Sequence, residues 1–172
     1  MSGYLQHFVL ILMLFGVVPR ATAQQQSFRI RVPVSAVIEA PSSAVQIVHD
    51  ESDADQSFPP QYWSVRGTYA AGMRVSFSTQ HAFTHTENTD FRRDAKIQLA
   101  IKETDGPGMW NIDQSEDSTQ YRSNDELAIV SASSNGIGRA KLAITVSFLT
   151  EEFGDFLPGD YQTQVVGTVT SN

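Results

Sequence analysis

Hydrophobic and polar residues alternate along most of this chain with a period of two. The first alternating stretch places five apolar residues on one face: Phe28, Ile30, Val32, Val34 and Ile38. A period of two indicates a half-buried β-strand, because successive strand side chains point to opposite faces. Pro33 has no N–H for a ladder, so this strand is predicted to lie at a sheet edge or to be interrupted there.

The same alternation predicts further strands over residues 45–48, 62–66, 74–79, 95–102, 126–133, 140–148 and 161–170. Asn135-Gly136 lies between two of them and predicts a tight hairpin turn, since both residue types tolerate positive φ. No window of about 11 residues has a helical period. About seven or eight short strands separated by turns predict an all-β fold, a single antiparallel sandwich of the immunoglobulin-like or pilin-like kind.

An apolar run precedes this predicted domain. It extends from His7 to Val18, and Ala21 and Ala23 follow at the small-residue positions of a cleavage site. The run is shorter than the roughly 20 apolar residues that a membrane span needs, and the pattern is typical of a secretory signal peptide. We therefore predict a signal peptide over residues 1–23 and a secreted, periplasmic or cell-surface domain over residues 24–172 without a membrane span. An uncleaved N-terminal anchor is the alternative.

Charge and cysteine content restrict the function classes. The 172 residues include 12 Lys and Arg against 19 Asp and Glu, a formal net charge of −7. An acidic surface disfavours nucleic acid and anionic membranes as partners. The chain has no cysteine, which excludes a disulfide scaffold, thiol catalysis and cysteine-based zinc sites.

Candidate catalytic or metal chemistry is sparse. The acidic loop with Asp50, Asp53 and Asp55 lacks the glycine and the spacing of a calcium-binding EF-hand loop. His81 and His85 would lie about 13 Å apart on a strand, too far for one metal ion. No serine has a G-x-S-x-G setting. We therefore expect no enzymatic activity, no cofactor and no metal site.

Three aromatic residues suggest an alternative function. Tyr62, Trp63 and Trp110 lie in or near predicted loops, where exposed rings could stack on sugar faces. Aromatic side chains also fill sandwich cores. An extracellular carbohydrate- or ligand-binding module, with a glycan as its partner, is therefore the second functional hypothesis.

The end of the chain carries a family resemblance. In "LPGDYQTQVVGTVT", Pro158-Gly159-Asp160 forms a predicted turn and Tyr161 opens an alternating strand. Immunoglobulin-like sandwiches have such a tyrosine near the start of strand F. This ending and the strand that opens at Phe28 resemble bacterial pilin-like and fimbrial-subunit-like secreted proteins, including spore-coat-U-like and fimbria-like families of unknown function.

The resemblance implies a structural or interaction protein of the bacterial cell envelope rather than an enzyme. In that class, the sandwich lacks one strand, and an extended segment of a neighbour or of a chaperone supplies it. The partner would then be a second copy or another envelope protein, held by β-strand addition. The strand-pairing face would consist of Phe28, Ile30, Val32, Val34 and Ile38. The residues leave open whether this strand closes its own sheet or that of a neighbour.

Overall fold

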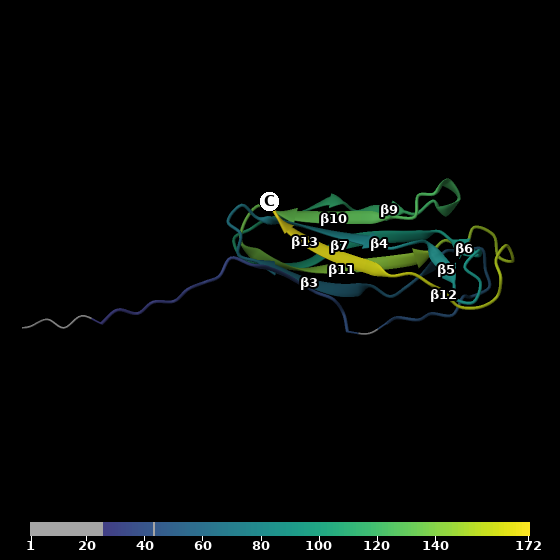
Figure 1. Ribbon diagram of the computed structural model, residues 1–172, viewed down its shortest axis with the longest axis horizontal. Coiled ribbons are helices and arrows are strands. Elements are labelled where there is room, and N and C mark those ends of the chain that lie inside the picture. Colours follow the sequence, from purple (N-terminus) through teal and green to yellow (C-terminus); the bar gives the residue numbers. More distant parts are fainter. Residues whose placement is uncertain (1–25, 43) are drawn as a thin grey trace, which may run out of the picture. The chain divides into compact units, whose positions relative to one another are not determined.

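The computed structural model describes residues 26–42 and 44–172 (Figure 1). The chain divides into two units, Met1–Arg31 and Val32–Asn172, and the strands lie in the second. The predicted signal peptide, residues 1–23, lies outside the described residues. In the described part of the chain, no helix is long and apolar enough to cross a membrane.

The described residues form thirteen strands and one short 3₁₀-helix. The strands are β1 (Ala36–Glu39), β2 (Gln56–Ser57), β3 (Gln61–Gly67), β4 (Met73–Thr79), β5 (Phe83–His85), β6 (Arg92–Arg93), β7 (Ala95–Asp105), β8 (Trp110–Gln114), β9 (Glu116–Ser118), β10 (Ile129–Ser134), β11 (Gly138–Phe148), β12 (Tyr161–Gln162) and β13 (Val165–Ser171); the 3₁₀-helix is Tyr121–Ser123. This confirms the predicted all-β fold. There are more strands than predicted because several have only two or three residues.

The strands form antiparallel sheets that pack as a sandwich. The first sheet has the order β1-β3-β11-β7-β9, with β2 also paired to β11, and the second has the order β13-β4-β10-β8. One buried cluster joins Val65, Leu142 and Ile144 of the first sheet to Val75 and Phe77 of the second. A small third sheet, β12-β5-β6, extends the fold at one end. The two large sheets therefore enclose a common core.

The first strand is shorter than predicted. Only β1 is paired, with Ala36 opposite Gly67 and Glu39 opposite Ser64 of β3. Residues 26–35 belong to no strand of the described structure. Pro33, which cannot donate to a ladder, lies in the unpaired part, and pairing begins after it at Ala36.

The turn at Asn135-Gly136 does not form the predicted hairpin. The strand before it, β10, belongs to the second sheet, and the strand after it, β11, belongs to the first. Neither residue has a positive φ, which a two-residue hairpin turn of this type needs. Asn135 instead donates its N–H to Met109 O at 3.1 Å and accepts the Met109 N–H with Oδ1 at 2.8 Å. The turn therefore carries the chain from one sheet to the other.

The C-terminal strand is present with an interruption. The predicted run over residues 161–170 is divided into β12 and β13, and Gly159 before it has a φ of 148°. The Tyr161 hydroxyl donates to Leu157 O at 3.0 Å. A tyrosine hydroxyl that bonds to backbone a few residues upstream is the arrangement of a tyrosine corner. Tyr161 thus makes the backbone contact that such a tyrosine makes in immunoglobulin-like sandwiches.

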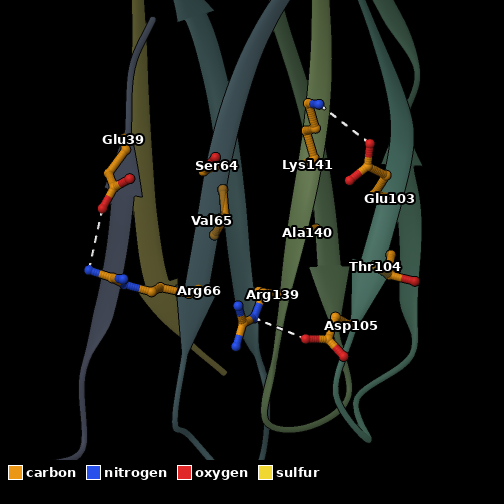
Figure 2. A pocket seen from close by; sticks show the side chains of 10 residues that line it. All are labelled: Glu39, Ser64, Val65, Arg66, Glu103, Thr104, Asp105, Arg139, Ala140 and Lys141. Atoms are coloured by element: carbon orange, nitrogen blue, oxygen red, sulfur yellow. Dashed lines mark hydrogen bonds and ion pairs between the residues drawn. The ribbon is translucent and has the colours of Figure 1, made fainter.

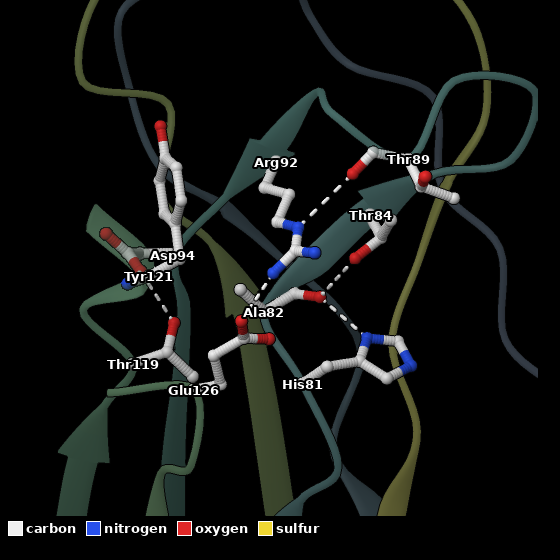
Figure 3. Close-up of polar contacts among 9 residues, drawn as sticks. All are labelled: His81, Ala82, Thr84, Thr89, Arg92, Asp94, Thr119, Tyr121 and Glu126. Carbon is white, nitrogen blue, oxygen red and sulfur yellow. Dashed lines mark hydrogen bonds and ion pairs between the residues drawn. The ribbon is translucent and has the colours of Figure 1, made fainter. Parts of the chain in front are cut away.

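A polar network fixes the loops at the β5–β6 end of the sandwich (Figure 3). Asp94 Oδ1 accepts hydrogen bonds from Thr119 Oγ1 at 2.7 Å and from Tyr121 N at 2.9 Å. Arg92 forms an ion pair with Glu126. These contacts join β6 to the segment that follows β9. They hold the end of the fold on which the site described below is built.

Candidate functional site

A cavity of about 810 Å³ lies at one edge of the sandwich. This volume is within the range of about 300–1,000 Å³ that ligand pockets have. Its apolar lining comes from strands and loops that are distant in sequence: Phe58, Trp63, Phe83, Ile144, Val146, Phe148, Phe156 and Tyr161. Five glutamines also line it: Gln46, Gln56, Gln61, Gln162 and Gln164. The cavity therefore combines an aromatic interior with neutral amide groups.

Two strand edges border this cavity. β13 pairs with β4 on one side, and no described strand pairs with its other side. β3 pairs with β1 only at residues 64–67, so residues 61–63 pair only with β11. Gln61, Trp63 and Val165 from these two strands line the cavity. We call the cavity together with these two strand edges the groove.

The backbone groups of β13 that face the groove follow from its pairing with β4. Gln164 O accepts a hydrogen bond from Gln80 N at 3.0 Å, and Asn172 N donates to Gly72 O at 3.2 Å. Hydrogen-bonded and non-hydrogen-bonded pairs alternate along an antiparallel ladder. The even-numbered residues therefore bond to β4 and its neighbours. The N–H and C=O groups of the odd-numbered residues 165–171 point to the open edge.

Beyond the cavity, β1 packs against β13 through side chains and does not pair with its backbone. Gly167 of β13 faces Ile38 of β1, and a Cβ atom at Gly167 would lie 2.6 Å from Ile38 Cδ1 and 3.0 Å from Trp63 Cζ3. Glycine therefore allows β1 to lie against β13. Trp63 also packs edge-on against Phe77, with ring centroids 5.2 Å apart. The cavity is confined to the region beyond the C-terminal end of β1.

Residues 44–48, the covering segment, line the cavity without joining either strand edge. Val45 and Ile47 are half-buried and line the cavity, whereas the alternate positions are exposed. Within the described structure, the backbone of residues 40–42 and 44–48 makes no hydrogen bond. The strand predicted over residues 45–48 is therefore wrong. Its alternation is present, but no neighbouring strand pairs with its backbone.

His49 anchors the C-terminal end of the covering segment. Its Nδ1 accepts the Glu51 N–H at 3.0 Å, and its Nε2 lies 3.0 Å from Thr150 Oγ1. The ring packs against Phe153 and Phe156 with centroid distances of 5.5 and 5.3 Å. The sequence gives no signal for this role, because His49 and Thr150 are 101 positions apart.

The five predicted strand-pairing residues are divided between two environments. Ile38 lies in β1 and packs against the core. Phe28, Ile30, Val32 and Val34 have exposed fractions between 68% and 89%. We call residues 26–35 the arm. Its apolar residues are therefore available to a partner, whereas Ile38 already serves the chain's own sandwich.

Thr68 fixes the C-terminal end of the arm. The Thr68 hydroxyl accepts the Ser35 N–H at 2.9 Å and donates to Pro33 O at 2.8 Å. The Thr68 N–H donates to Ser35 O at 2.9 Å. Thr68 follows β3 at the end remote from the cavity, since residues 61 and 63 at the other end line it. Pro33 and Ser35 are thus held beyond that remote end.

The aromatic residues of the glycan-binding hypothesis do not form one platform. Neighbouring residues of a strand point to opposite faces, and only Trp63 of the three lines the cavity. Tyr62 is half-exposed, with Lys141 Nζ 5.1 Å above its ring. Trp110 lies in the core with an exposed fraction of 9%. A shared stacking surface of Tyr62, Trp63 and Trp110 is not formed.

Arg93 lies behind the aromatic side of the groove and was not singled out by the sequence. It is 3% exposed, its guanidinium lies 5.2 Å from the Phe156 ring centroid, and its Nη1 lies 3.5 Å from Tyr121 Oη. Its Nε and Nη2 have no hydrogen-bond partner in the described structure. Burial raises the pKa of the neighbouring Tyr161, and the Arg93 charge and the hydrogen bond to Leu157 act in the opposite direction.

A shallower hollow of about 350 Å³ lies on the outer face of the first sheet (Figure 2). Three ion pairs cross its strands: Arg66–Glu39 at 3.3 Å, Arg139–Asp105 at 3.1 Å and Lys141–Glu103 at 3.4 Å. All six side chains are exposed, so each pair contributes about 0–1 kcal/mol. Opposite charges neutralise one another within this hollow, which indicates a solvated sheet face.

Among the described residues, no group of three or more His, Asp and Glu side chains lies close enough together to hold a metal ion. No protein-family model and no curated protein sequence matches the chain. The functional argument therefore depends on the geometry of the groove and the arm.

Proposed function

We propose that this protein is a secreted or cell-envelope structural and interaction module that assembles by β-strand addition. In this proposal, the arm of one copy enters the groove of a second copy. One observation carries the proposal. The same chain has an exposed arm with apolar residues at alternate positions and a sandwich edge with unpaired backbone groups beside an apolar cavity. Each feature is the complement of the other.

The energetics favour an occupant that uses both the cavity and the strand edge. Burial of each large apolar side chain of the arm contributes about 1.5–3 kcal/mol. Ordering the arm costs roughly 1–2 kcal/mol per residue, which cancels much of that gain. Each hydrogen bond to the outward groups of β13 adds about 0.5–1.5 kcal/mol. Association therefore requires side-chain burial and backbone pairing together, because burial alone is largely cancelled by the cost of ordering the arm.

The anchoring of the arm favours a partner in a second copy over the chain's own groove. Thr68 holds Pro33 and Ser35 beyond the end of β3 that is remote from the cavity. This hold restrains the arm where it joins β1, at a distance from the chain's own cavity. A second copy has no such constraint.

The chemistry of the arm specifies how it would sit. Phe28, Ile30 and Val32 would point into the cavity, and Arg29 and Arg31 would point to solvent, because successive strand residues face opposite sides. The backbone of the arm would pair with the odd-numbered residues of β13. Export of the protein is part of the proposal and is supported by the signal-peptide pattern of residues 1–23.

Sedimentation velocity over a range of protein concentrations tests this proposal. The arm variant Ile30→Asp/Val32→Asp places charges on the inward set of positions, and the matched control Arg29→Ser/Arg31→Ser changes the outward set. We expect the wild type and the control to form multimers whose mass increases with concentration, and the arm variant to remain monomeric. A monomeric wild type, or an arm variant that associates as the wild type does, contradicts the proposal.

A further inference from the structure

The covering segment lines the same cavity as the two strand edges to which a strand could be added. Val45 and Ile47 line the cavity beside Trp63 and Val165, which belong to the two strand edges. An incoming strand that pairs with either edge must pass through the same opening. The segment and the arm of a second copy are therefore competitors for one volume.

The covering segment is held by its ends and side chains rather than by its backbone. At its N-terminal side, β1 pairs with β3 as far as Glu39. At its C-terminal side, His49 contacts Thr150 and the rings of Phe153 and Phe156. Between these anchors, the described backbone of residues 40–48 makes no hydrogen bond. The segment can leave the cavity without breaking a ladder.

A paired strand would bind in the groove more strongly than the covering segment does. The two half-buried side chains of the segment bury apolar surface, but the outward N–H and C=O groups of β13 gain no partner from it. An added strand supplies both kinds of interaction, since main-chain bonds give affinity and alternate side chains fill pockets. The covering segment therefore has the properties of an occupant that can be displaced.

We infer that residues 44–48 are an internal occupant that closes the groove of the monomer and is displaced when a strand is added. The inference rests on the proposed function, because it specifies how strand addition at this groove is regulated. Displacement slows association, because only the fraction of molecules with an open groove can accept the arm. The device protects the exposed edge of β13 from unspecific pairing until the correct strand arrives.

The test uses the full chain with the substitutions Ile30→Asp/Val32→Asp, which prevent self-association. The probe is a fluorescein-labelled peptide of residues 26–35, and its association rate constant is measured by fluorescence anisotropy. Val45→Ser/Ile47→Ser weakens the hold of the segment on the cavity. Val48→Ser, at a position with an exposed fraction of 89%, is the matched control. Far-ultraviolet circular dichroism verifies that each variant is folded.

The inference predicts that the peptide associates with Val45→Ser/Ile47→Ser about tenfold faster than with the parent, and with Val48→Ser at the parent's rate. Equal or slower association with Val45→Ser/Ile47→Ser overturns the inference, because the segment is then a wall of the site. A second measurement, without peptide, records the fluorescence of 1-anilinonaphthalene-8-sulfonate, which reports access to apolar cavities.

The dye separates failure of this inference from failure of the proposed function. If the peptide binds none of the proteins but the dye signal rises only in Val45→Ser/Ile47→Ser, the proposed function is wrong and the covering segment still closes the cavity. If the peptide binds none of them and the dye signal is the same in all, the inference is overturned as well. If the peptide binds, its association rate constants decide whether the covering segment is displaced or is a fixed part of the site.

Discussion

Gly167 allows the two sheets to meet at the edge of the sandwich, and Gly167→Ala tests this arrangement. The new Cβ would lie 2.6 Å from Ile38 Cδ1, 3.0 Å from Trp63 Cζ3 and 3.1 Å from Phe77 Cε1. Favourable carbon–carbon contacts have separations of about 3.5–4.0 Å. Gly167 has no positive φ, so the backbone itself accepts alanine. The cost therefore comes from side-chain crowding alone.

The magnitude follows from how little these neighbours can move. Phe77 is fully buried and packs against Trp63 with ring centroids 5.2 Å apart. Adding a methyl group to such a packed site lowers the free energy of unfolding by about 1–3 kcal/mol. Ile38→Val removes the nearest atom, Cδ1, and by itself costs about 0.5–1.5 kcal/mol. The two substitutions together should cost less than their sum, by about 0.5–2 kcal/mol.

Urea unfolding of the wild type, the two single variants and the double variant measures this coupling. An unchanged dependence of the unfolding free energy on urea concentration would show that the unfolded state is unaffected. A neutral or stabilising Gly167→Ala, or strict additivity with Ile38→Val, refutes the reasoning. In that case the side chain of Ile38 in β1 does not pack against β13 at Gly167.

Three further predictions concern Tyr161, Arg93 and the predicted signal peptide. Tyr161→Phe should lower the free energy of unfolding at neutral pH by about 0.5–1.5 kcal/mol, because the hydrogen bond to Leu157 is lost. Since burial raises the Tyr161 pKa above 10.0 in the folded state, the associated stability is complete below that pH and is lost above it, so unfolding curves should show a smaller alkaline decrease for the variant. Arg93→Met should leave the Tm unchanged or higher, because a buried guanidinium with two unpartnered nitrogens is removed; a clear decrease in the Tm would contradict this interpretation of Arg93. The intact mass of the exported protein should correspond to a chain that begins at Gln24, and retention of residues 1–23 would contradict the predicted cleavage.

The regular strands of the core could be predicted from local alternation. The patterns over residues 62–66, 74–79, 95–102 and 140–148 correspond to β3, β4, β7 and β11. Their inward side chains meet in one core, so the period of two and the actual burial agree. A pattern read one strand at a time does not specify which strands pair. The turn at residues 135–136 consequently connects two sheets, although its residue types favour a hairpin.

The groove could not be predicted because it forms where two alternating segments have no partner strand. Residues 28–34 and 45–48 have the alternation of strands, but the described structure gives their backbones no partner strand. The cavity brings together Phe58, Ile144 and Tyr161 from distant parts of the chain. The sequence did indicate the apolar face of the arm, since that property is local. It gave no indication of the space left beside β13.

Residue-resolved hydrogen exchange along β13 is the most direct test of strand addition. The protein is the full-chain variant Ile30→Asp/Val32→Asp, and exchange of its amides is followed by NMR with and without the peptide of residues 26–35. Without peptide, the amides of the odd-numbered residues 165, 167 and 169 should exchange faster than the β4-bonded amides of their even-numbered neighbours. Bound peptide should protect these odd-numbered amides and leave the even-numbered ones unchanged. No added protection at residues 165–169, or protection confined to another strand, would contradict the account.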